Sequence, residues 1–528
     1  MMGMRCIIWI IVAVIVQIAL SQRAQHWNDE AKIALNEALR LEMDWGVAKN
    51  VILFLGDGMD ITTQTAARIF KGQRKGETGE EGYLRWHKFP YVALSKTYNT
   101  DRQVPDSAGT GTAYLTGVKT KFGTIGFDDG IVRYDCATEQ VGVPQESIGV
   151  RADKEGKATG FISTTRVTHA SPANLYAHVA DRNWESDDDL TEEAVNLGCT
   201  DIASQFIENA GFFKVVLAGG RREMTPVGQA DPEYPEKEGQ RLDNRDLIQE
   251  WVDSKENMNA QYVWNLDDFN GVNPDDTDYL LGLFEPSHMN YERDRELDAA
   301  GEPSIAEMTE KAIQILSKDE DGYFLFVEGG RIDHGHHAGV AYNALLDTLA
   351  FEEAVEKALD MVDLKETLVI VTADHGHVMT MAGYPSRGNP ILGKNDIYMG
   401  DDGLPFSTLA YMNGPGAPQV HEAFNKTGKR PDLTNVDTED PHYLQDALVP
   451  LVELEETHGG QDVGIFAIGP MAHLFHGVHE QTYVNHVMRY ASCLDYKEHC
   501  ENPVGGASSL GAVLVTLLSS FLAAVFLQ

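Results

Sequence analysis

Three runs of apolar residues, far apart in the chain, each end in a carboxylate beside glycine. They are Val51–Leu55 before Asp57, Tyr323–Phe326 before Glu328, and Leu368–Ala373 before Asp374. Short apolar runs bounded by turn residues are typical of buried strands. In an open α/β sheet, ligands bind beyond the carboxyl ends of the strands. The repeated ending therefore predicts an α/β fold whose strands deliver acidic side chains to one shared site.

The richest of these endings is Val327–His337, which holds two carboxylates and three histidines. Buried charges are costly unless they are paired or bind a metal, so this stretch is a poor core segment. Carboxylate oxygen together with imidazole nitrogen suits zinc, whereas oxygen ligands suit magnesium. Taken alone, the stretch fits a polar surface loop as well as it fits a metal site.

Four residues elsewhere are further candidates, and each has an ordinary structural alternative. Asp57 fits an Asp-Gly turn, and Ser107 fits the N-cap of a helix as well as a nucleophile activated by a metal ion. Arg182 fits a surface ion pair or a bidentate phosphate clamp. His458 fits a loop histidine or a metal ligand beside a predicted core strand. The convergence of several such features, rather than any single one, favours a metal site.

The charge balance restricts the class of partner. The chain has 42 basic and 81 acidic residues, a formal net charge of −39. Such a chain repels phosphate backbones at long range, which argues against a nucleic-acid-binding protein. An anionic substrate would have to be attracted by local positive charge, such as metal ions.

Both ends of the chain carry targeting signals. Residues 1–21 read as a secretory signal peptide, with a signal anchor as the alternative. Residues 501–528 combine small residues with an apolar tail, which fits a glycosyl-phosphatidylinositol (GPI) attachment signal. A C-terminal membrane span is the alternative reading. The candidate attachment residues are Asn502, Gly505, Gly506 and Ala507.

Secretion fits the cysteine content. Once Cys6 leaves with the signal peptide, four cysteines remain, which allow two disulfides in three pairings. The short separation of Cys493 and Cys500 favours a local loop, which leaves Cys136 to pair with Cys199. A glycosylation sequon begins at Asn425.

The rest of the chain alternates between predicted strands and helices. An amphipathic helix is predicted at His26–Met43, and longer helices are predicted at Met308–Leu316 and Ala341–Leu359. Residues 231–298 are acidic and rich in turns, and residues 381–456 lose the alternation and read as an inserted subdomain. The α/β domain is therefore expected over residues 22–380 and 457–500. Further strands are predicted at Ala158–Ser163, Val215–Ala218 and Ile465–Gly469.

From about residue 40 to 500, separate motifs occur in the order found in the alkaline phosphatases, which the chain resembles. They are Gly56–Met59, Pro105–Thr110, Thr165–Pro172, Asp181–Arg182, Glu328–His337, Thr372–His375 and Thr457–Gly460. The resemblance implies a mostly parallel central sheet flanked by helices, with a crown subdomain at residues 381–456. The two ends resemble those of the animal cell-surface branch, with insect gut enzymes as a candidate home. A homodimer, anchored by GPI on the extracellular face of the plasma membrane, is also implied.

The resemblance assigns metal ligands residue by residue. It implies two zinc ions, one magnesium ion and one calcium ion. The first zinc takes Asp333, His337 and His458, and the second takes Asp374, His375 and Asp57. Asp57 also bridges to magnesium, which Ser171 and Glu328 complete and which His169 reaches through water. The calcium ligands are Glu233, the carbonyl of Phe284, Glu285 and Asp298, although the chain departs from the family pattern around Asp298.

The same resemblance implies hydrolysis of phosphate monoesters through a phosphoserine at Ser107, with Arg182 as the phosphate clamp. A phosphodiesterase or sulfatase on this scaffold is one alternative. Sulfatases resemble a Cys-x-Pro-x-Arg pattern that Pro105–Gly109 lacks, and the diesterases typically use threonine and lack the magnesium ligands that Ser171 and Glu328 supply here. A surface receptor without catalysis is the alternative from another class.

Overall fold

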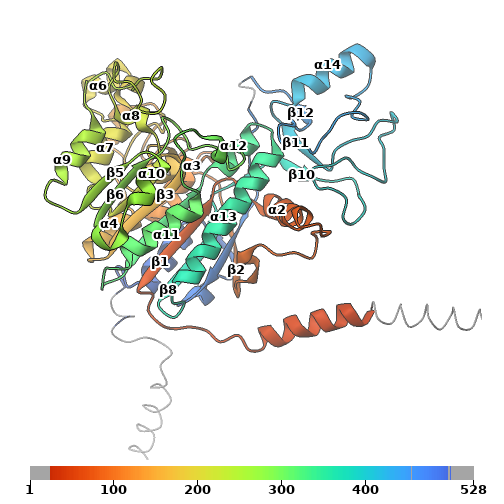
Figure 1. Ribbon diagram of the computed structural model, residues 1–528, viewed down its shortest axis with the longest axis horizontal. Coiled ribbons are helices and arrows are strands. Elements are labelled where there is room, and N and C mark those ends of the chain that lie inside the picture. The colour runs from red at the N-terminus through yellow and green to blue at the C-terminus, as the bar shows by residue number, and fades with distance from the viewer. Residues whose placement is uncertain (1–23, 453–454, 497–499, 501–528) are drawn as a thin grey trace, which may run out of the picture. The chain divides into compact units, whose positions relative to one another are not determined.

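The computed structural model describes residues 24–452, 455–496 and 500, which are drawn in colour in Figure 1. The chain divides into two units, Met1–Asp44 and Trp45–Gln528. In the first unit residues 24–38 form a helix, so the predicted N-terminal helix is present but ends before Met43. The predicted signal peptide and the attachment tail lie outside the described residues. Within the described ranges, no helix has the length and apolar character that crossing a bilayer requires.

The second unit is built on a ten-stranded sheet in the order β15-β2-β14-β8-β1-β7-β3-β4-β6-β5. Strand β14 runs antiparallel to both of its neighbours, and the other neighbouring pairs run parallel. The predicted mostly parallel sheet is therefore confirmed. The strands are β1 (Asn50–Gly56), β2 (Tyr91–Lys96), β3 (Ala158–Arg166), β4 (Val215–Gly219), β5 (Ala260–Val263), β6 (Tyr279–Leu283), β7 (Tyr323–Gly329), β8 (Thr367–Ala373), β14 (Val463–Ile468) and β15 (Gly477–Glu480).

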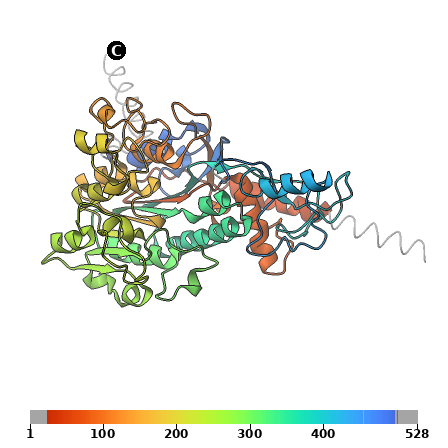
Figure 2. The ribbon, with the colours of Figure 1, turned by 90° about the horizontal axis from the view of Figure 1, so that it is seen from above.

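Helices cover both faces of this sheet (Figures 1 and 2). Successive side chains of β1 point to opposite faces, so that Leu53 and Leu55 join one apolar cluster while Ile52 and Phe54 join the other. Buried residues on both faces explain why the strand reads as a continuous apolar run. The first cluster includes residues of α3 (Ser107–Thr116), α4 (Ile148–Lys154) and α15 (Thr482–Ala491), and the second those of α2 (Ile61–Arg74), α11 (Ile305–Leu316) and α13 (Ala341–Met361).

The register of the three central strands places their acidic endings side by side. Gly56 at the end of β1 pairs with Gly329 of β7 on one side and with Ala373 of β8 on the other. Asp57 and Asp374 therefore leave the sheet at the same level. Glu328 lies one residue before Gly329, opposite Leu55 of β1. The shared edge that the sequence predicts is present.

Three features differ from the sequence-based expectation or refine it. The polar stretch after β7 is not a loop, because Arg331–His337 forms helix α12. The acidic region 231–298 contains β5 and β6, together with α9 (Leu247–Ser254) and α10 (Leu266–Gly271). Its strands were missed because they are short and β5 is partly polar.

A separate small sheet lies in the region predicted as an inserted subdomain. It has three strands, β10 (Met379–Met381), β11 (Leu409–Asn413) and β12 (Ala447–Val449), and α14 (Ala417–Thr427) lies beside it in Figure 1. Both predicted disulfides are confirmed, between Cys136 and Cys199 and between Cys493 and Cys500.

Candidate metal centre and active site

Ser107 is the first residue of α3 and faces the edge where the strands end. The Asp106 side chain caps this helix by accepting hydrogen bonds from the backbone of Gly109 at 3.2 Å and of Gly123 at 2.9 Å. The Ser107 Oγ lies 3.1 Å from His375 Nε2. A helix N-terminus favours negative charge nearby. The hydroxyl is thus placed where a bound anion and an oxyanion form of serine are both favoured.

Asp333, His337 and His458 form one cluster, although His458 is far from the other two in the chain. Asp333 and His337 are four residues apart on α12 and so lie on one face of it. The Nε2 atoms of His337 and His458 are 3.0 Å apart, and each lies 3.3 Å from an oxygen of Asp333.

The other ring nitrogens of these two histidines show what the cluster is built to hold. Nδ1 of His337 hydrogen-bonds to the carbonyl of Glu456, and Nδ1 of His458 to that of Pro105 at 2.8 Å. Because a carbonyl only accepts, each Nδ1 carries a proton, and each neutral ring then directs an Nε2 lone pair at the other. Two lone pairs at this distance repel unless a cation lies between them. This second-ring hydrogen bond is also the usual arrangement of metal-binding histidines.

A second cluster is formed by Asp57, Asp374 and His375. Nε2 of His375 lies 3.1 Å from Asp374 Oδ2 and 3.5 Å from Asp57 Oδ1. Asp374 is oriented by the backbone N–H of Gly58 at 3.0 Å and by the Thr110 hydroxyl at 3.3 Å. The three residues are buried and share one small volume. One imidazole nitrogen and two carboxylates are a donor set that zinc accepts.

A third group joins Asp57 to Glu328, Ser171 and His169. Within the described part of the chain, both oxygens of Asp57, Oγ of Ser171 and Oε1 of Glu328 are buried and have no hydrogen-bond partner. Buried polar atoms are nearly always satisfied, so this set of orphaned oxygens indicates a ligand. Oxygen donors of this kind suit magnesium. Asp57, Glu328 and His169 lie close enough together to share one ion.

The pKa values of the acidic groups show the cost of this arrangement in the absence of cations. Burial raises the pKa of Asp57 well above its usual value, and the nearby carboxylates of Asp374 and Asp333 raise it further. Burial also raises the pKa of Glu328 to about 7. Like charges in one buried site cannot all ionise. Divalent cations would reverse this and hold the carboxylates in their charged form.

Arg182 reaches into the same site from the other side. Its guanidinium pairs with Asp106 Oδ2 at 3.1 Å and lies 3.2 Å from Nε2 of His169. Asp106 therefore holds both the start of the Ser107 helix and the arginine. A fixed guanidinium of this kind suits bidentate recognition of a phosphate group.

Ser107, Arg182, Asp333, His337 and His458 open into one cleft of about 1010 Å³. Its lining carries an excess of arginine over the rest of the molecule, although the chain has a net charge of −39. The cleft therefore offers local positive charge to an anionic substrate. The arginines that line it are Arg133, Arg166, Arg182 and Arg331.

The four predicted calcium residues lie apart from the catalytic residues. Glu285 and Asp298 are joined through the hydroxyl of Tyr234, which lies 3.2 Å from Glu285 Oε1 and 3.5 Å from Asp298 Oδ1. Burial raises the pKa of Glu233 to about 7, and the adjacent carboxyl of Asp298 adds to this effect. The three carboxylates thus converge, and Phe284 is the buried residue next to Glu285. The donor set is one of oxygens, as calcium requires.

Sequence reasoning missed two residues that support the Asp333 cluster. His377 donates or accepts through Nε2 to Asp333 at 2.8 Å and through Nδ1 to Glu456 at 2.6 Å. Burial lowers the pKa of His377, but the charges of Glu456 and Asp333 outweigh it and raise the pKa to about 10. His377 is therefore an imidazolium that holds Asp333 from behind. Its place two residues after His375 was the available signal.

Comparison with known proteins gives one consistent result. The alkaline phosphatase family model matches residues 48–494. The tissue-nonspecific alkaline phosphatase isozyme of Gallus gallus is 47% identical over 503 residues, covering 94% of this chain and 95% of that protein. An alkaline phosphatase of Gadus morhua is 48% identical over 474 residues, covering 89% and 97% respectively.

Solved structures agree on the fold. The alkaline phosphatase of Thermus thermophilus superposes with a TM-score of 0.59 at 24% identity, covering 85% of this chain and 92% of that one. A variant of the enzyme from the Antarctic bacterium TAB5, described with magnesium bound in a site termed M3, superposes with a TM-score of 0.59 at 23% identity, covering 86% and 99%. At this identity the likeness concerns the fold.

Proposed function

Because this chain belongs to the alkaline phosphatase family and hydrolyses phosphate monoesters, we propose that Ser107 is the nucleophile of a two-step reaction in the cleft. The observation that carries the proposal is the position of the Ser107 hydroxyl. It lies at a helix N-terminus, 3.1 Å from His375, with Arg182 held on the neighbouring Asp106. A reactive hydroxyl, a phosphate clamp and two metal-ligand clusters thus face one cleft.

In the first step, the Ser107 oxygen forms a bond to phosphorus as the bond from phosphorus to the alcohol oxygen breaks. The alcohol leaves with a proton, and a phosphoserine remains. In the second step, water attacks the phosphoserine, releases inorganic phosphate and restores the hydroxyl. Arg182 holds the non-bridging oxygens in both steps by charge-assisted hydrogen bonds. The leaving group points out of the cleft, so a broad range of monoesters is expected.

The metal ligands are proposed as follows. Asp333, His337 and His458 hold one zinc ion, and Asp57, Asp374 and His375 hold the other. Asp57, Ser171 and Glu328 hold magnesium, with His169 contacting it through water. When bound, these ions lower the pKa of a coordinated hydroxyl and stabilise the charge on the leaving oxygen. Support comes from the facing Nε2 atoms of His337 and His458 and from the orphaned oxygens of Asp57.

A calcium ion is proposed at Glu233, the carbonyl of Phe284, Glu285 and Asp298. Its role is structural, because these residues do not line the cleft that contains Ser107. The three carboxylates meet around Tyr234, and burial raises the pKa of Glu285. An uncompensated cluster of this kind favours a bound cation.

We also propose that the protein is secreted, anchored by GPI on the outer face of the plasma membrane, and homodimeric. Two disulfides support passage through an oxidising compartment. The proposed domain limits are residues 22–380 and 457–500 for the catalytic domain and 381–456 for the crown. The insect assignment stays a prediction. Release from cells by a phosphatidylinositol-specific phospholipase tests the anchor, and protein that stays on the membrane would favour a C-terminal span.

The decisive test of function compares a nitrophenyl phosphate monoester with the matching diester. Turnover of the monoester is expected to exceed that of the diester by several orders of magnitude, with transient labelling of Ser107 by substrate phosphate. Equal or preferential turnover of the diester would favour the phosphodiesterase alternative. Absence of turnover by the zinc- and magnesium-loaded protein would favour the receptor alternative.

A further inference from the structure

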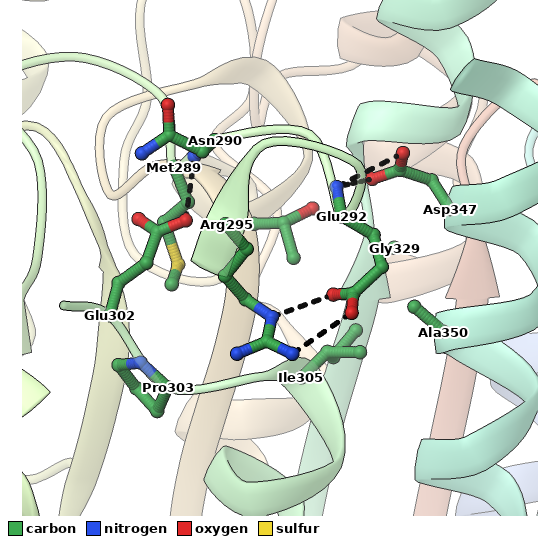
Figure 3. Close-up of a pocket in the computed structure, with 11 residues that line it drawn as sticks. Met289, Asn290, Glu292, Arg295, Glu302, Pro303, Ile305, Gly329, Asp347 and Ala350 are labelled. Atoms are coloured by element: carbon green, nitrogen blue, oxygen red, sulfur yellow. Dashed lines mark hydrogen bonds and ion pairs between the residues drawn. The ribbon is translucent and has the colours of Figure 1, made fainter. Parts of the chain in front are cut away.

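Glu302 is a buried carboxylate that none of the proposed centres uses. It lies in the loop before α11 and is 1% exposed. Its Oε1 accepts a hydrogen bond from the backbone N–H of Asn290 at 2.9 Å, whereas Oε2 has no hydrogen-bond partner among the residues that the structure describes. Figure 3 shows its carboxylate beside Met289 and Asn290. An unpaired buried carboxylate is costly, so the position asks for a ligand.

Asn290 connects Glu302 to the proposed calcium centre. Its side-chain amide donates to Glu285 Oε1 at 3.0 Å, while its backbone N–H donates to Glu302. One residue thus holds both carboxylates. Burial raises the pKa of Glu302 well above its usual value, and the charges of Glu285 and Asp298 raise it further. The last observation means that Glu302 lies within electrostatic reach of two of the proposed calcium ligands.

The nearby arginines do not neutralise this group. Arg221 is buried, but it pairs with Asp231 at 2.8 Å as well as with Glu233 at 3.0 Å. Arg295 lies near Glu302 in Figure 3, but its guanidinium bonds to both oxygens of Glu292, at 2.8 and 2.9 Å. The carboxylates around Tyr234 therefore stay in excess.

Free oxygens remain on the neighbouring carboxylates as well. Glu233 Oε1 and Asp298 Oδ2 are buried and, like Glu302 Oε2, make no hydrogen bond within the described ranges. A cavity of about 20 Å³ lies against Glu302 and Asn290, which is room for one water molecule. Calcium takes six to eight oxygen ligands, including waters, in flexible geometry. Three carboxylates and one carbonyl leave room in that shell for another carboxylate.

We propose that Glu302 is a fourth carboxylate of the calcium centre, alongside Glu233, Glu285 and Asp298. This inference rests on the proposed calcium site. It assigns the segment from Asp298 to Glu302 a specific purpose, because the segment brings a second acidic side chain back to the ion before α11 begins. The added negative charge favours tight binding of calcium and makes the folded segment depend on it.

The test measures calcium binding directly, without using phosphatase activity. Zinc- and magnesium-loaded protein is dialysed against radiolabelled calcium, and the bound calcium per chain is counted. The unmodified protein is expected to bind one calcium ion. Glu302→Gln is expected to weaken that binding by about 10-fold or more. Glu296→Gln is the matched control, because Glu296 lies in the same segment and is exposed; its calcium affinity is expected to stay unchanged.

Two results would overturn the proposal. The first is a folded Glu302→Gln protein that binds calcium as tightly as the unmodified protein, which would leave the proposed calcium centre standing without Glu302. The second is an unmodified protein that binds no calcium, which would remove the centre itself while monoester turnover still tests the catalytic proposal. If the Gln variant does not fold, Glu302→Asp replaces it. This variant shortens the side chain by one methylene and is expected to weaken binding several-fold, and unchanged affinity would again overturn the proposal.

Discussion

At the scale of single residues, the site is recognisable from which polar atoms lack a partner. His337 and His458 direct unprotonated nitrogens at each other, and Asp57 buries two oxygens that find no donor in the described chain. Such groups destabilise a protein unless a ligand satisfies them. The same reasoning separates Ser107, whose hydroxyl faces the cleft, from the many serines that only cap helices.

The role of Ser107 makes a direct prediction. Ser107→Ala is expected to lower kcat for a nitrophenyl phosphate by at least about 10³-fold, because no other hydroxyl is placed to accept the phosphoryl group. Zinc content, measured by elemental analysis, is expected to stay unchanged because the zinc ligands remain. Ser254→Ala, in α9 away from the cleft, is the control. Near-normal turnover of the Ser107 variant would refute the nucleophile assignment.

His377 is predicted to control zinc affinity without touching the metal. It links Asp333 to Glu456, so His377→Gln removes the charge that orients a zinc ligand. Zinc affinity of the Asp333 cluster is expected to fall by about 10-fold or more, measured by competition with a chromogenic chelator. His336→Gln is the matched control: this buried neighbour bonds to Thr63 and Tyr411 instead. Equal effects of the two changes would contradict the prediction.

Glu139 is predicted to make stability depend on pH. Burial raises its pKa from 4.5 to about 7 in the folded protein, so the folded state binds more protons than the unfolded state between those values. Stability is therefore highest below the lower value and falls as pH rises through the higher one. Glu139→Gln is expected to remove this loss. The Tm difference between variant and parent should grow between about pH 5 and about pH 8, and a constant difference would argue against the assignment.

At the scale of elements, α3 shows how a helix start can be held in place by distant loops. Asp106 caps the helix, accepts from Gly123 and pairs with Arg182, while its own N–H donates to Asn99 at 3.1 Å. The position of Ser107 thus depends on packing around the first turn. Gly109 is part of that packing, because a Cβ there would lie 1.6 Å from Asn99 Nδ2.

Gly109→Ala is predicted to displace Asn99 and with it the start of α3. Overpacking of this kind costs about 1–3 kcal/mol of stability, measured by denaturant unfolding. A small displacement of a reacting group lowers kcat by about 10²-fold, measured with a nitrophenyl phosphate. Gly271→Ala at the end of α10 is the control, since nothing lies within 4 Å of a Cβ at that position. A Gly109 variant with normal stability and turnover would show that the first turn tolerates the methyl group.

At the scale of the whole molecule, the sheet collects its acidic endings into one volume. The level register of β7, β1 and β8 delivers carboxylates to the same edge, and α3 and α12 add the serine and two more ligands. A chain with a net charge of −39 can bind an anion there because arginines line the cleft and cations complete it. The fold therefore depends on its metals as much as the metals depend on the fold.

Removal of divalent cations is predicted to destabilise the whole domain. A ligand that binds only the folded state at about 1,000 times its Kd contributes about 4 kcal/mol. Chelation is therefore expected to lower Tm by about 5 °C or more, measured by calorimetry, and zinc with magnesium should restore it. A Tm that does not respond to chelation, in protein shown by elemental analysis to be metal-free, would contradict this coupling.

The sequence alone determined the chemistry and the main strands. The apolar runs before Asp57, Glu328 and Asp374 correctly placed β1, β7 and β8, because strands buried on both faces have a pattern that neighbouring residues reveal. The types of ligand were likewise readable, since zinc and magnesium select for imidazole and carboxylate.

Only the tertiary structure decided which of these residues meet. His458 joins Asp333 across more than a hundred residues, and no local pattern encodes that contact. The supporting pair of His377 and Glu456, and the placement of Glu302 beside Asn290, also arise from contacts between separate loops. Side-chain chemistry is a property of each residue, whereas the burial and spacing that turn it into a site belong to the folded chain.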